Sequence, residues 1–124
     1  MAALFSKNTF AHTTEGDLLR VTYTGKIKSK EMLEIMSKIY KLIDLHGSKK
    51  ILIDALNSNV HLEVHEIVPM AKAHPASFKK VKTAVVEKPK KESQYSLYQM
   101  VAEDNKVNMQ FFSTFEEAEA WLAS

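Results

Sequence analysis

The sequence predicts a single α/β domain, residues 1–124, with a five-stranded mixed sheet and flanking helices in the order β-β-α-β-α-β-α-β-α. Short apolar runs alternate along the chain with segments whose apolar residues recur every three or four positions, a pattern typical of strands alternating with helices. Such an alternation favours right-handed crossovers and a mostly parallel sheet. The length of 124 residues suits one domain, and only three glycines and three prolines favour short connections.

Residues 9–14 and 18–24 predict two antiparallel strands joined by a tight turn. Apolar and polar residues alternate in the second segment, LLRVTYT, as they do in a half-buried strand. The turn contains Glu15, Gly16 and Asp17, and glycine readily adopts the positive φ that hairpin turns require.

Residues 30–46 form the most clearly periodic segment and predict an amphipathic helix. Ser29 precedes this segment as an N-cap, and Gly47 follows it, where a left-handed residue ends a helix. The apolar stripe of the helix consists of Met32, Ile35, Met36, Ile39, Leu42 and Ile43.

The middle of the chain predicts a buried strand, a loop and a second helix. Residues 49–54 (KKILID) form an apolar run after a helix, which favours a parallel strand. Residues 56–60 are predicted to be a loop, because their central Asn-Ser-Asn run is rich in turn formers. The second helix is predicted over residues 62–74, since Pro75 disfavours helix in the residue before it.

The last third of the chain predicts two further strand–helix units. Residues 81–87 (VKTAVVE) form the fourth strand, and Ser93 caps a third helix that runs through Asp104. Residues 107–112 (VNMQFF) form the fifth strand, and Thr114 caps the final helix. The inner face of that final helix is predicted to contain Phe115, Ala118, Trp121 and Leu122.

Composition and motifs exclude or disfavour several classes of function. The chain has no cysteine and therefore no disulfide or thiolate metal site. A net charge of +2 is small for a nucleic-acid-binding protein, so we expect no nucleic acid as a partner. No phosphate loop, nucleophile elbow or zinc-protease motif occurs, which favours a non-enzymatic protein without a cofactor. His61 and His65 are interpreted either as metal ligands on one helical face, with Glu66 and His74 as further candidates, or, as we favour, as exposed side chains.

Three segments resemble the SpoIIAA-like family. They are residues 16–21 (GDLLRV), residues 51–54 (ILID) and residues 112–122 (FSTFEEAEAWL), of which the last is the most specific. SpoIIAA-like proteins are bacterial relatives of the STAS domains of anti-sigma-factor antagonists, and their fold is similar to that of the CRAL-TRIO lipid carriers. The resemblance covers essentially the whole chain and implies the same α/β fold.

The resemblance also implies how this chain differs from the antagonists. Those proteins carry a phosphorylatable serine two residues after the aspartate that ends the central strand. Here Asp54 resembles that aspartate, and Leu56 stands at the position of the serine. A phosphorylation switch of that type is therefore not expected, and the nearby Ser58 is interpreted as a turn former.

Lysines gather in the connections that follow the predicted parallel strands. The carboxyl ends of such strands share one edge of a sheet, where ligands commonly bind. The polar candidates for contact with a ligand or a membrane at this edge are Lys26, Lys28, Lys30, Asn57, Ser58, Lys88, Lys90 and Lys91. Because each basic group near an anionic bilayer contributes about 1 kcal/mol, an anionic membrane surface is one expected partner.

The second and third predicted helices are apolar on more than one side, so each needs a partner besides the sheet. In one interpretation they pack on each other or form a homodimer. In the other, they bind the tail of an anionic amphipathic molecule whose head lies among the lysines. The apolar candidates are Leu56, Val60, Leu62, Val64, Ile67, Val68, Met70, Ala71, Tyr95, Tyr98 and Val101.

The function that the sequence predicts is a non-enzymatic module that binds a small hydrophobic or lipid-like molecule. The alternative is a protein-interaction or signalling module related to the anti-sigma-factor antagonists. No apolar run reaches the roughly 20 residues of a membrane span, and residues 1–7 lack a basic region typical of signal peptides. We therefore expect a cytoplasmic location, with peripheral contact at the inner membrane as a linked hypothesis.

Overall fold

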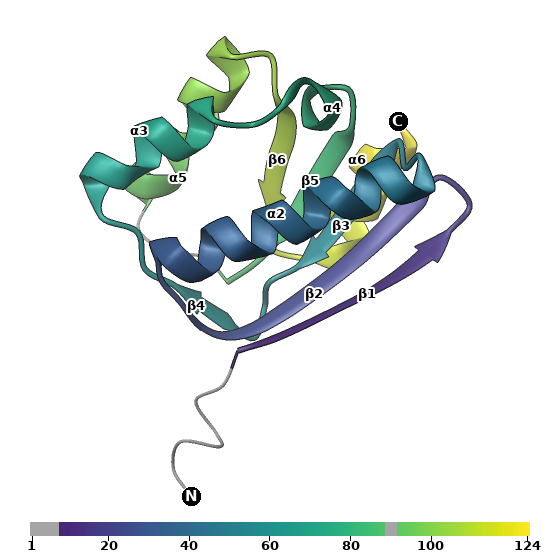
Figure 1. The fold of residues 1–124 in the computed structure, drawn as a ribbon, viewed down its shortest axis with the longest axis horizontal. Helices are drawn as coiled ribbons and strands as arrows, with labels where there is room; N and C mark the ends of the chain where they lie inside the picture. Colours follow the sequence, from purple (N-terminus) through teal and green to yellow (C-terminus); the bar gives the residue numbers. More distant parts are fainter. Residues whose placement is uncertain (1–7, 89–91) are drawn as a thin grey trace, which may run out of the picture.

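The chain forms a central β-sheet that is covered by helices on both faces (Figure 1). The computed structural model describes residues 8–88 and 92–124, of which residues 92–96 are described by their backbone alone. Lys90, Lys91 and the side chain of Tyr95, all named above as candidates, lie outside the described residues.

The elements follow the labels of Figure 1. The strands are β1 (Thr9–Glu15), β2 (Leu18–Ile27), β3 (Lys50–Asp54), β4 (Ser58–Val60), β5 (Lys82–Val86) and β6 (Asn108–Phe112). The helices are α2 (Ser29–His46), α3 (Val64–Lys72), α4 (Ala76–Lys79), α5 (Glu92–Asp104) and α6 (Phe115–Ala123).

The sheet is mixed, as predicted, and its main path has the order β1-β2-β3-β5-β6. Strand β1 pairs antiparallel with β2 through the predicted hairpin, whereas β2, β3, β5 and β6 are parallel. Val21 is in register with Ile53, and Ile53 with Val85. The carboxyl ends of four strands therefore lie at one edge of the sheet.

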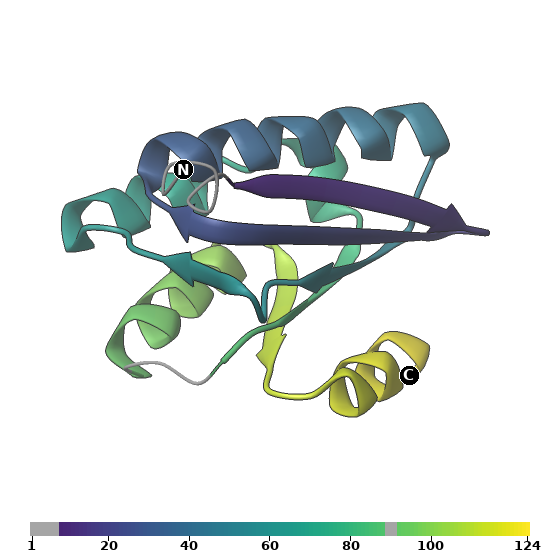
Figure 2. The same cartoon turned by 90° about the horizontal axis from the view of Figure 1, so that it is seen from below.

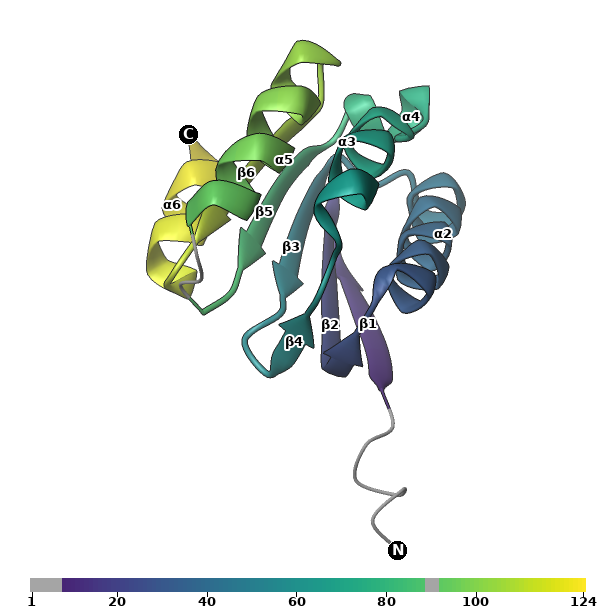
Figure 3. The same cartoon turned by 90° about the vertical axis from the view of Figure 1, so that its left-hand side faces the viewer.

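Two hydrophobic clusters lie on the two faces of the sheet. The larger contains buried residues of α2, α4 and α5 together with alternate residues of the strands, such as Val21 and Ile53. The smaller lies on the opposite face, where Ala118 and Leu122 of α6 pack against Leu52. Figure 2 shows α2 and α6 on opposite sides of the sheet, and Figure 3 shows α3 between α2 and α5.

The predicted helix ends are confirmed at two positions. Gly47 adopts a φ of 64°, and its N–H donates to the carbonyl of Ile43 at 2.8 Å. The Thr114 hydroxyl accepts from the N–H of Glu117 at 3.2 Å, so Thr114 is the N-cap of α6.

Two other predicted caps are wrong. Helix α2 already begins at Ser29, and the N–H of the preceding Lys28 donates to the Glu31 carboxylate at 2.9 Å. The carboxylate satisfies the N–H of the N-cap residue Lys28, and Ser29 is a residue of the helix rather than its cap. Ser93 lies inside α5, which begins at Glu92.

The predicted loop over residues 56–60 is wrong for its second half. Ser58–Val60 forms the short strand β4, which pairs parallel with Gly25, Lys26 and Ile27 at the end of β2. Strand β2 extends to Ile27 for the same reason, because β4 satisfies the backbone groups of this extension. A sixth strand is thus added beside the predicted five.

The predicted helix over residues 62–74 is too long at both ends. Helix α3 spans only Val64–Lys72, and the chain then forms the separate short helix α4 after Pro75. Pro75 is the N-cap of α4, with backbone in the extended region, and α3 has already ended before it, with Ala73 as its C-cap.

The apolar stripe of α2 supports a test of this packing. Ile39 is fully buried in the larger cluster, so Ile39→Ala is expected to lower the free energy of unfolding by about 2–5 kcal/mol. The measurement is urea denaturation followed by circular dichroism. Leu45→Ala is the control on the same helix, because Leu45 is 75 % exposed, and its effect is expected to stay within about 0.5 kcal/mol. Equal losses in the two variants would contradict the assigned orientation of α2.

Candidate functional site

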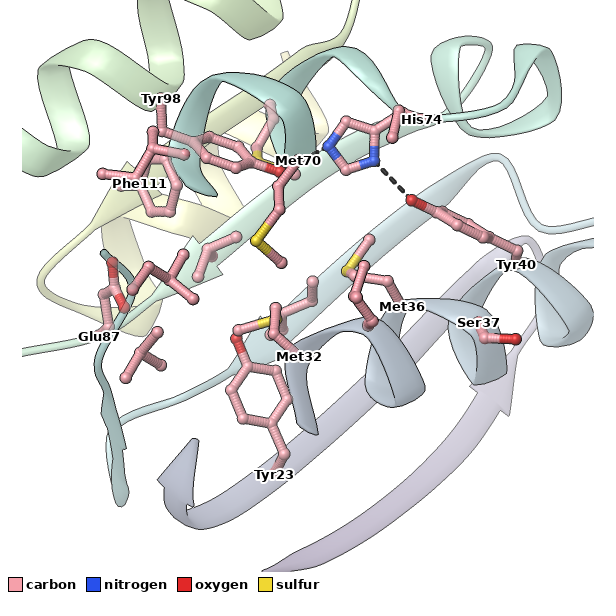
Figure 4. Close-up of a pocket in the computed structure, with 18 residues that line it drawn as sticks. Tyr23, Met32, Met36, Ser37, Tyr40, Met70, His74, Glu87, Tyr98 and Phe111 are labelled. Atoms are coloured by element: carbon pink, nitrogen blue, oxygen red, sulfur yellow. Dashed lines mark hydrogen bonds between the residues drawn. The ribbon is translucent and has the colours of Figure 1, made fainter. Parts of the chain in front are cut away.

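A pocket with a volume of about 330 Å³ lies between α2 on one side and α3 and α5 on the other (Figure 4). The sheet supplies its floor through Tyr23, Ile53, Val85, Met109 and Phe111. The walls contain Met32, Leu33, Met36, Ser37 and Tyr40 of α2, Ile67 and Met70 of α3, and Tyr98 of α5. Strand β4 and the connecting segments complete the lining with Val60, Leu62, Ala73, His74 and Glu87.

The periodicity of α2 places two stripes side by side. Residues four apart lie on one face of a helix, so Ile35, Ile39 and Ile43 form the stripe that is buried on the sheet. Met32, Met36 and Tyr40 follow the same spacing one position later and line the pocket. Because methionine is unbranched and flexible, the two methionines of this stripe form an adaptable apolar wall.

His74 connects the two walls of the pocket. Its Nδ1 lies 2.7 Å from the hydroxyl of Tyr40 on α2, and its Nε2 lies 2.5 Å from the hydroxyl of Tyr98 on α5. The imidazole is only 5 % exposed and stacks on Phe78, with 4.6 Å between ring centroids. Figure 4 shows His74 and Tyr40 at one end of the pocket.

Burial keeps His74 neutral. It lowers the pKa of the imidazole from 6.5 to about 4, and the positive charge of Lys79 acts in the same direction. Burial also raises the pKa of Tyr40 to about 12 and raises that of Tyr98, so both hydroxyls stay protonated at neutral pH. A neutral imidazole has one N–H and one acceptor nitrogen, so one tyrosine donates to His74 and the other accepts from it.

Glu87 and Tyr23 form a second polar group, toward the opposite end of the pocket in Figure 4. Glu87 follows β5 directly, its side chain is buried, and its N–H donates to the carbonyl of Phe112 at 3.0 Å. Burial raises the pKa of Tyr23, and the negative charge of Glu87 raises it further. The Tyr23 hydroxyl is therefore neutral beside a buried acidic side chain.

Five of the apolar candidates named from the sequence line the pocket. They are Val60, Leu62, Ile67, Met70 and Tyr98. The described lining does not include the candidates Leu56, Val64, Val68, Ala71 and Val101.

Helical spacing predicts an inner stripe of Val60, Val64, Ile67, Val68 and Ala71 for the second helix, and the first half of this stripe is wrong. Val60 belongs to β4, and Val64 is the first residue of α3 and is 66 % exposed. Leu56 packs with the cluster on the α6 face of the sheet. Ala71 and Val101 are buried on α3 and α5, which pack against each other.

The candidate lysines that the structure describes lie around the carboxyl edge of the sheet and outside the pocket lining. Lys26 stands near the end of β2, Lys28 and Lys30 flank the start of α2, and Lys88 follows β5; all four are exposed. Asn59 is in register with Lys26, which brings the neighbouring Asn57 and Ser58 to the same edge.

The polar residues around β4 have local structural roles. The Asp54 carboxylate accepts from the N–H of Leu56 at 3.1 Å, as in an Asx-turn. The Ser58 hydroxyl donates to the carbonyl of Ala55 at 2.7 Å, which agrees with its interpretation as a turn former. His61 precedes α3, so it does not share a helical face with His65, and the described residues contain no cluster that could hold a metal ion.

Sequence reasoning did not identify the hydrogen-bonded polar groups of the pocket. It noted His74 only as the end of a predicted helix and as a further candidate metal ligand beside His61 and His65, and Glu87 only as the end of a predicted strand. One signal was available for Glu87, because a carboxylate directly after the buried run TAVV is unusual for a parallel strand.

Comparisons with known proteins support the fold. The model of the SpoIIAA-like family matches residues 18–123. An uncharacterized protein of the DUF3478 family from Shewanella loihica PV-4, with a SpoIIAA-like fold, is 17 % identical, with 93 % of each chain covered and a TM-score of 0.54. A search of curated proteins finds no significant match.

Two further solved structures are similar over nearly their whole length. An anti-sigma factor antagonist from Mycobacterium paratuberculosis is 14 % identical, with 96 % of this chain and 97 % of that one covered and a TM-score of 0.61. The Bacillus cell fate determinant SpoIIAA, in its phosphorylated form, is 11 % identical, with 92 % and 99 % covered and a TM-score of 0.52. At these identities the similarity establishes the fold alone.

The depressed pKa of His74 predicts how stability depends on pH. The unfolded chain takes up a proton at His74 near pH 6.5, whereas the folded chain does so only near pH 4. The contribution of His74 is therefore complete above pH 6.5 and is lost as the pH falls toward 4, a loss on the order of 3 kcal/mol. Urea denaturation across this pH range measures it.

The variant His74→Gln removes the titrating group, so its stability is expected to fall less steeply over the same pH range. Subtracting its profile from that of the original protein cancels the titration of the carboxylates. His61→Gln, at an exposed position, is the control and is expected to keep the original slope. An unchanged slope in His74→Gln would contradict a neutral buried imidazole.

Proposed function

This chain belongs to the SpoIIAA-like family, and we propose that it is a non-enzymatic module that binds a small apolar molecule between α2 and the α3–α5 pair. The observation that carries the proposal is the pocket itself, which lies over the sheet and is lined mainly by apolar side chains. Its volume of about 330 Å³ is within the range of small-molecule sites.

The size of the pocket limits the ligand. At roughly 30 Å³ for each methylene-sized group, the pocket accommodates about ten such groups. Each methylene that leaves water contributes about 0.8 kcal/mol, so a chain of this length supplies enough free energy for binding without any polar contact. Leu33 and Ala73 are exposed at their positions in the lining and provide apolar contacts close to solvent.

The state of His74 supports a non-enzymatic role. An efficient general base has a pKa near the operating pH and is free to reach a substrate proton. Both ring nitrogens of His74 are hydrogen-bonded to tyrosine hydroxyls, and burial lowers its pKa to about 4. The imidazole is thus better suited to holding the walls together than to proton transfer.

Filling the pocket tests the proposal. Met70→Trp places a larger side chain where the Met70 side chain reaches between the walls in Figure 4. The affinity for 1-decanol, measured by isothermal titration calorimetry, is expected to fall by at least about tenfold, because the indole occupies the volume of several methylenes. Native mass spectrometry of protein purified without detergent is expected to show additional mass on the original protein and less on the variant.

Met100→Trp is the matched control, since Met100 is exposed on α5 and is not among the described lining residues. Its affinity for 1-decanol is expected to equal that of the original protein. Decanol binding that is absent from the original protein, or equal in the two variants, would exclude the pocket as the binding site.

A second candidate function is a protein-interaction or signalling module. The comparisons support this function better than ligand binding, because two similar structures are an anti-sigma factor antagonist and the cell fate determinant SpoIIAA. Leu56 at the position of the antagonists' serine means that such a module would act without that phosphorylation. Its partner surface would include the exposed side chains of Val64 and Met100. Native mass spectra with a bare monomer or homodimer favour this candidate.

We also propose peripheral contact with an anionic membrane through the lysines at the carboxyl edge. No described helix is both long and apolar enough to cross a membrane. The double substitution Lys28→Glu and Lys88→Glu is expected to weaken binding to phosphatidylserine vesicles by at least about tenfold at low salt, because each lysine contributes about 1 kcal/mol. Sedimentation with vesicles at low and high salt measures this.

The matched control is the double substitution Lys49→Glu and Lys80→Glu. These exposed lysines precede β3 and β5 and therefore lie at the opposite edge of the sheet. The control is expected to bind vesicles as the original protein does. Binding that is absent or insensitive to salt would remove the proposed membrane contact.

A further inference from the structure

We propose that the ligand of this pocket carries one uncharged oxygen, a carbonyl or a hydroxyl, that accepts a hydrogen bond from the Tyr23 hydroxyl. This ligand chemistry rests on the proposed binding of an apolar molecule in the same pocket, and it adds the nature of the ligand's polar group. Tyr23 is thereby the residue that distinguishes a ligand with a neutral acceptor from a pure hydrocarbon or a carboxylate of the same size.

The Tyr23 hydroxyl lies in the pocket without a hydrogen bond to any described residue. Tyr23 is only 5 % exposed, and its side chain lines the pocket. Figure 4 marks the hydrogen bond between Tyr40 and His74 with a dashed line and shows none at Tyr23. The other lining tyrosine, Tyr98, also bonds to His74. The hydroxyl of Tyr23 therefore meets only water or a ligand, and a ligand that displaces this water has to replace its hydrogen bond.

The sheet places the Tyr23 hydroxyl where a ligand can reach it. In Figure 4 the ring of Tyr23 extends from β2 into the pocket, and its hydroxyl lies beside Met32. Thr22 is in register with Asp54, so Ala55 is the neighbour of Tyr23 in the next row of the sheet. An alanine side chain is too short to cover the end of a tyrosine ring, so the hydroxyl stays open to the pocket on this side.

The protonation of Tyr23 makes its hydroxyl a hydrogen-bond donor. Burial raises the pKa of Tyr23, and the negative charge of Glu87 raises it further, so the hydroxyl keeps its proton at neutral pH. This proton pairs only with a group that has a free lone pair. A carbonyl or hydroxyl oxygen offers one, whereas a hydrocarbon or an ammonium group does not.

The surroundings of Tyr23 favour an acceptor without a formal charge. The negative charge of Glu87 acts at the Tyr23 hydroxyl, and it would act in the same way against a carboxylate placed there. The described lining contains no lysine or arginine that could offset the burial of an anion. A neutral oxygen loses much less hydration free energy on entering the pocket, so it is the acceptor that fits this position.

The rest of the pocket suits an apolar body. Met36 and Met70 lie between Tyr23 and the His74 end in Figure 4. Because the pocket accommodates about ten methylene-sized groups, the matching ligand is a ketone, alcohol or ester of roughly that size with its oxygen toward one end.

Three probes that share a phenyl ring on a four-carbon chain test the assignment of Tyr23: butylbenzene, the ketone 4-phenyl-2-butanone and 4-phenylbutanoate. Isothermal titration calorimetry near neutral pH measures their affinities for the original protein and for Tyr23→Phe. The substitution is expected to weaken ketone binding by at least about fivefold, because one hydrogen bond is lost, and to change the affinity for butylbenzene by less than about twofold. In the original protein, the carboxylate is expected to bind at least about tenfold more weakly than the ketone.

Thr22→Val is the matched control. It removes a hydroxyl from the adjacent position of β2, where the side chain points to the opposite face of the sheet and is not among the described lining residues. All three affinities are expected to stay within about twofold of those of the original protein. A loss of ketone affinity equal to that in Tyr23→Phe would refute the assignment of Tyr23.

The outcomes separate the two proposals. If neither butylbenzene nor the ketone binds the original protein, the proposed apolar site fails and the assignment of Tyr23 fails with it. If butylbenzene binds but the ketone does not, or the ketone binds equally to the original protein and Tyr23→Phe, the assignment is refuted and the apolar site stands. A carboxylate that binds as tightly as the ketone would refute the uncharged oxygen.

A second measurement applies if Tyr23→Phe does not fold. Infrared spectroscopy of the ketone, isotope-labelled at its carbonyl and bound to the original protein, reports whether that carbonyl accepts a hydrogen bond. A hydrogen-bonded carbonyl absorbs at a lower wavenumber than the same carbonyl in hexane, and this lower value is expected for the bound ketone. A band at the hexane value would show a carbonyl without a donor and would refute the assignment.

Discussion

The neutral imidazole of His74 is the interaction on which the shape of the pocket depends. It belongs to neither wall, yet it hydrogen-bonds Tyr40 on α2 and Tyr98 on α5. Because these groups are poorly exposed, breaking either bond leaves a buried polar atom unpaired, at a cost of about 1–3 kcal/mol. Burial also maintains the protonation states that these hydrogen bonds require, since it keeps the imidazole neutral and both tyrosine hydroxyls protonated. These hydrogen bonds therefore tie α2 to α5 at this end of the pocket, beside the ring contact of Tyr40 with Phe78 of α4.

The pocket exists because the helices on this face pack over different parts of the sheet. Helix α2 packs on β2, whereas α5 packs on β6 and α3. The middle strands β3 and β5 contribute Ile53 and Val85 to the floor, and α6 covers their other face. Side chains must fill the space between the walls. The methionines do so with flexible thioether chains, and the tyrosines with apolar rings that end in a polar hydroxyl. Adaptable packing of this kind leaves volume that a ligand can use.

Local sequence patterns predicted most of the fold but only part of the site. The stripe of α2, the apolar runs of β3 and β5 and the hairpin at Gly16 are signals within single segments, and the structure confirms them. Strand β4 was missed because its pairing with residues 25–27 of β2 is not visible within the Asn-Ser-Asn run itself. The His74 cluster was missed for the same physical reason: its hydrogen bonds span 34 and 24 residues of chain.

The carboxyl edge of the sheet carries charges of both signs at different depths, and depth determines what each can do. Lys26, Lys28 and Lys88 are exposed, so their fields are screened within about 10 Å at ordinary ionic strength. The Glu87 side chain is buried, where screening is weak and a mismatch of charge costs far more. A field at the exposed lysines is therefore felt mainly outside the molecule, whereas a charge at Glu87 is felt mainly inside the pocket.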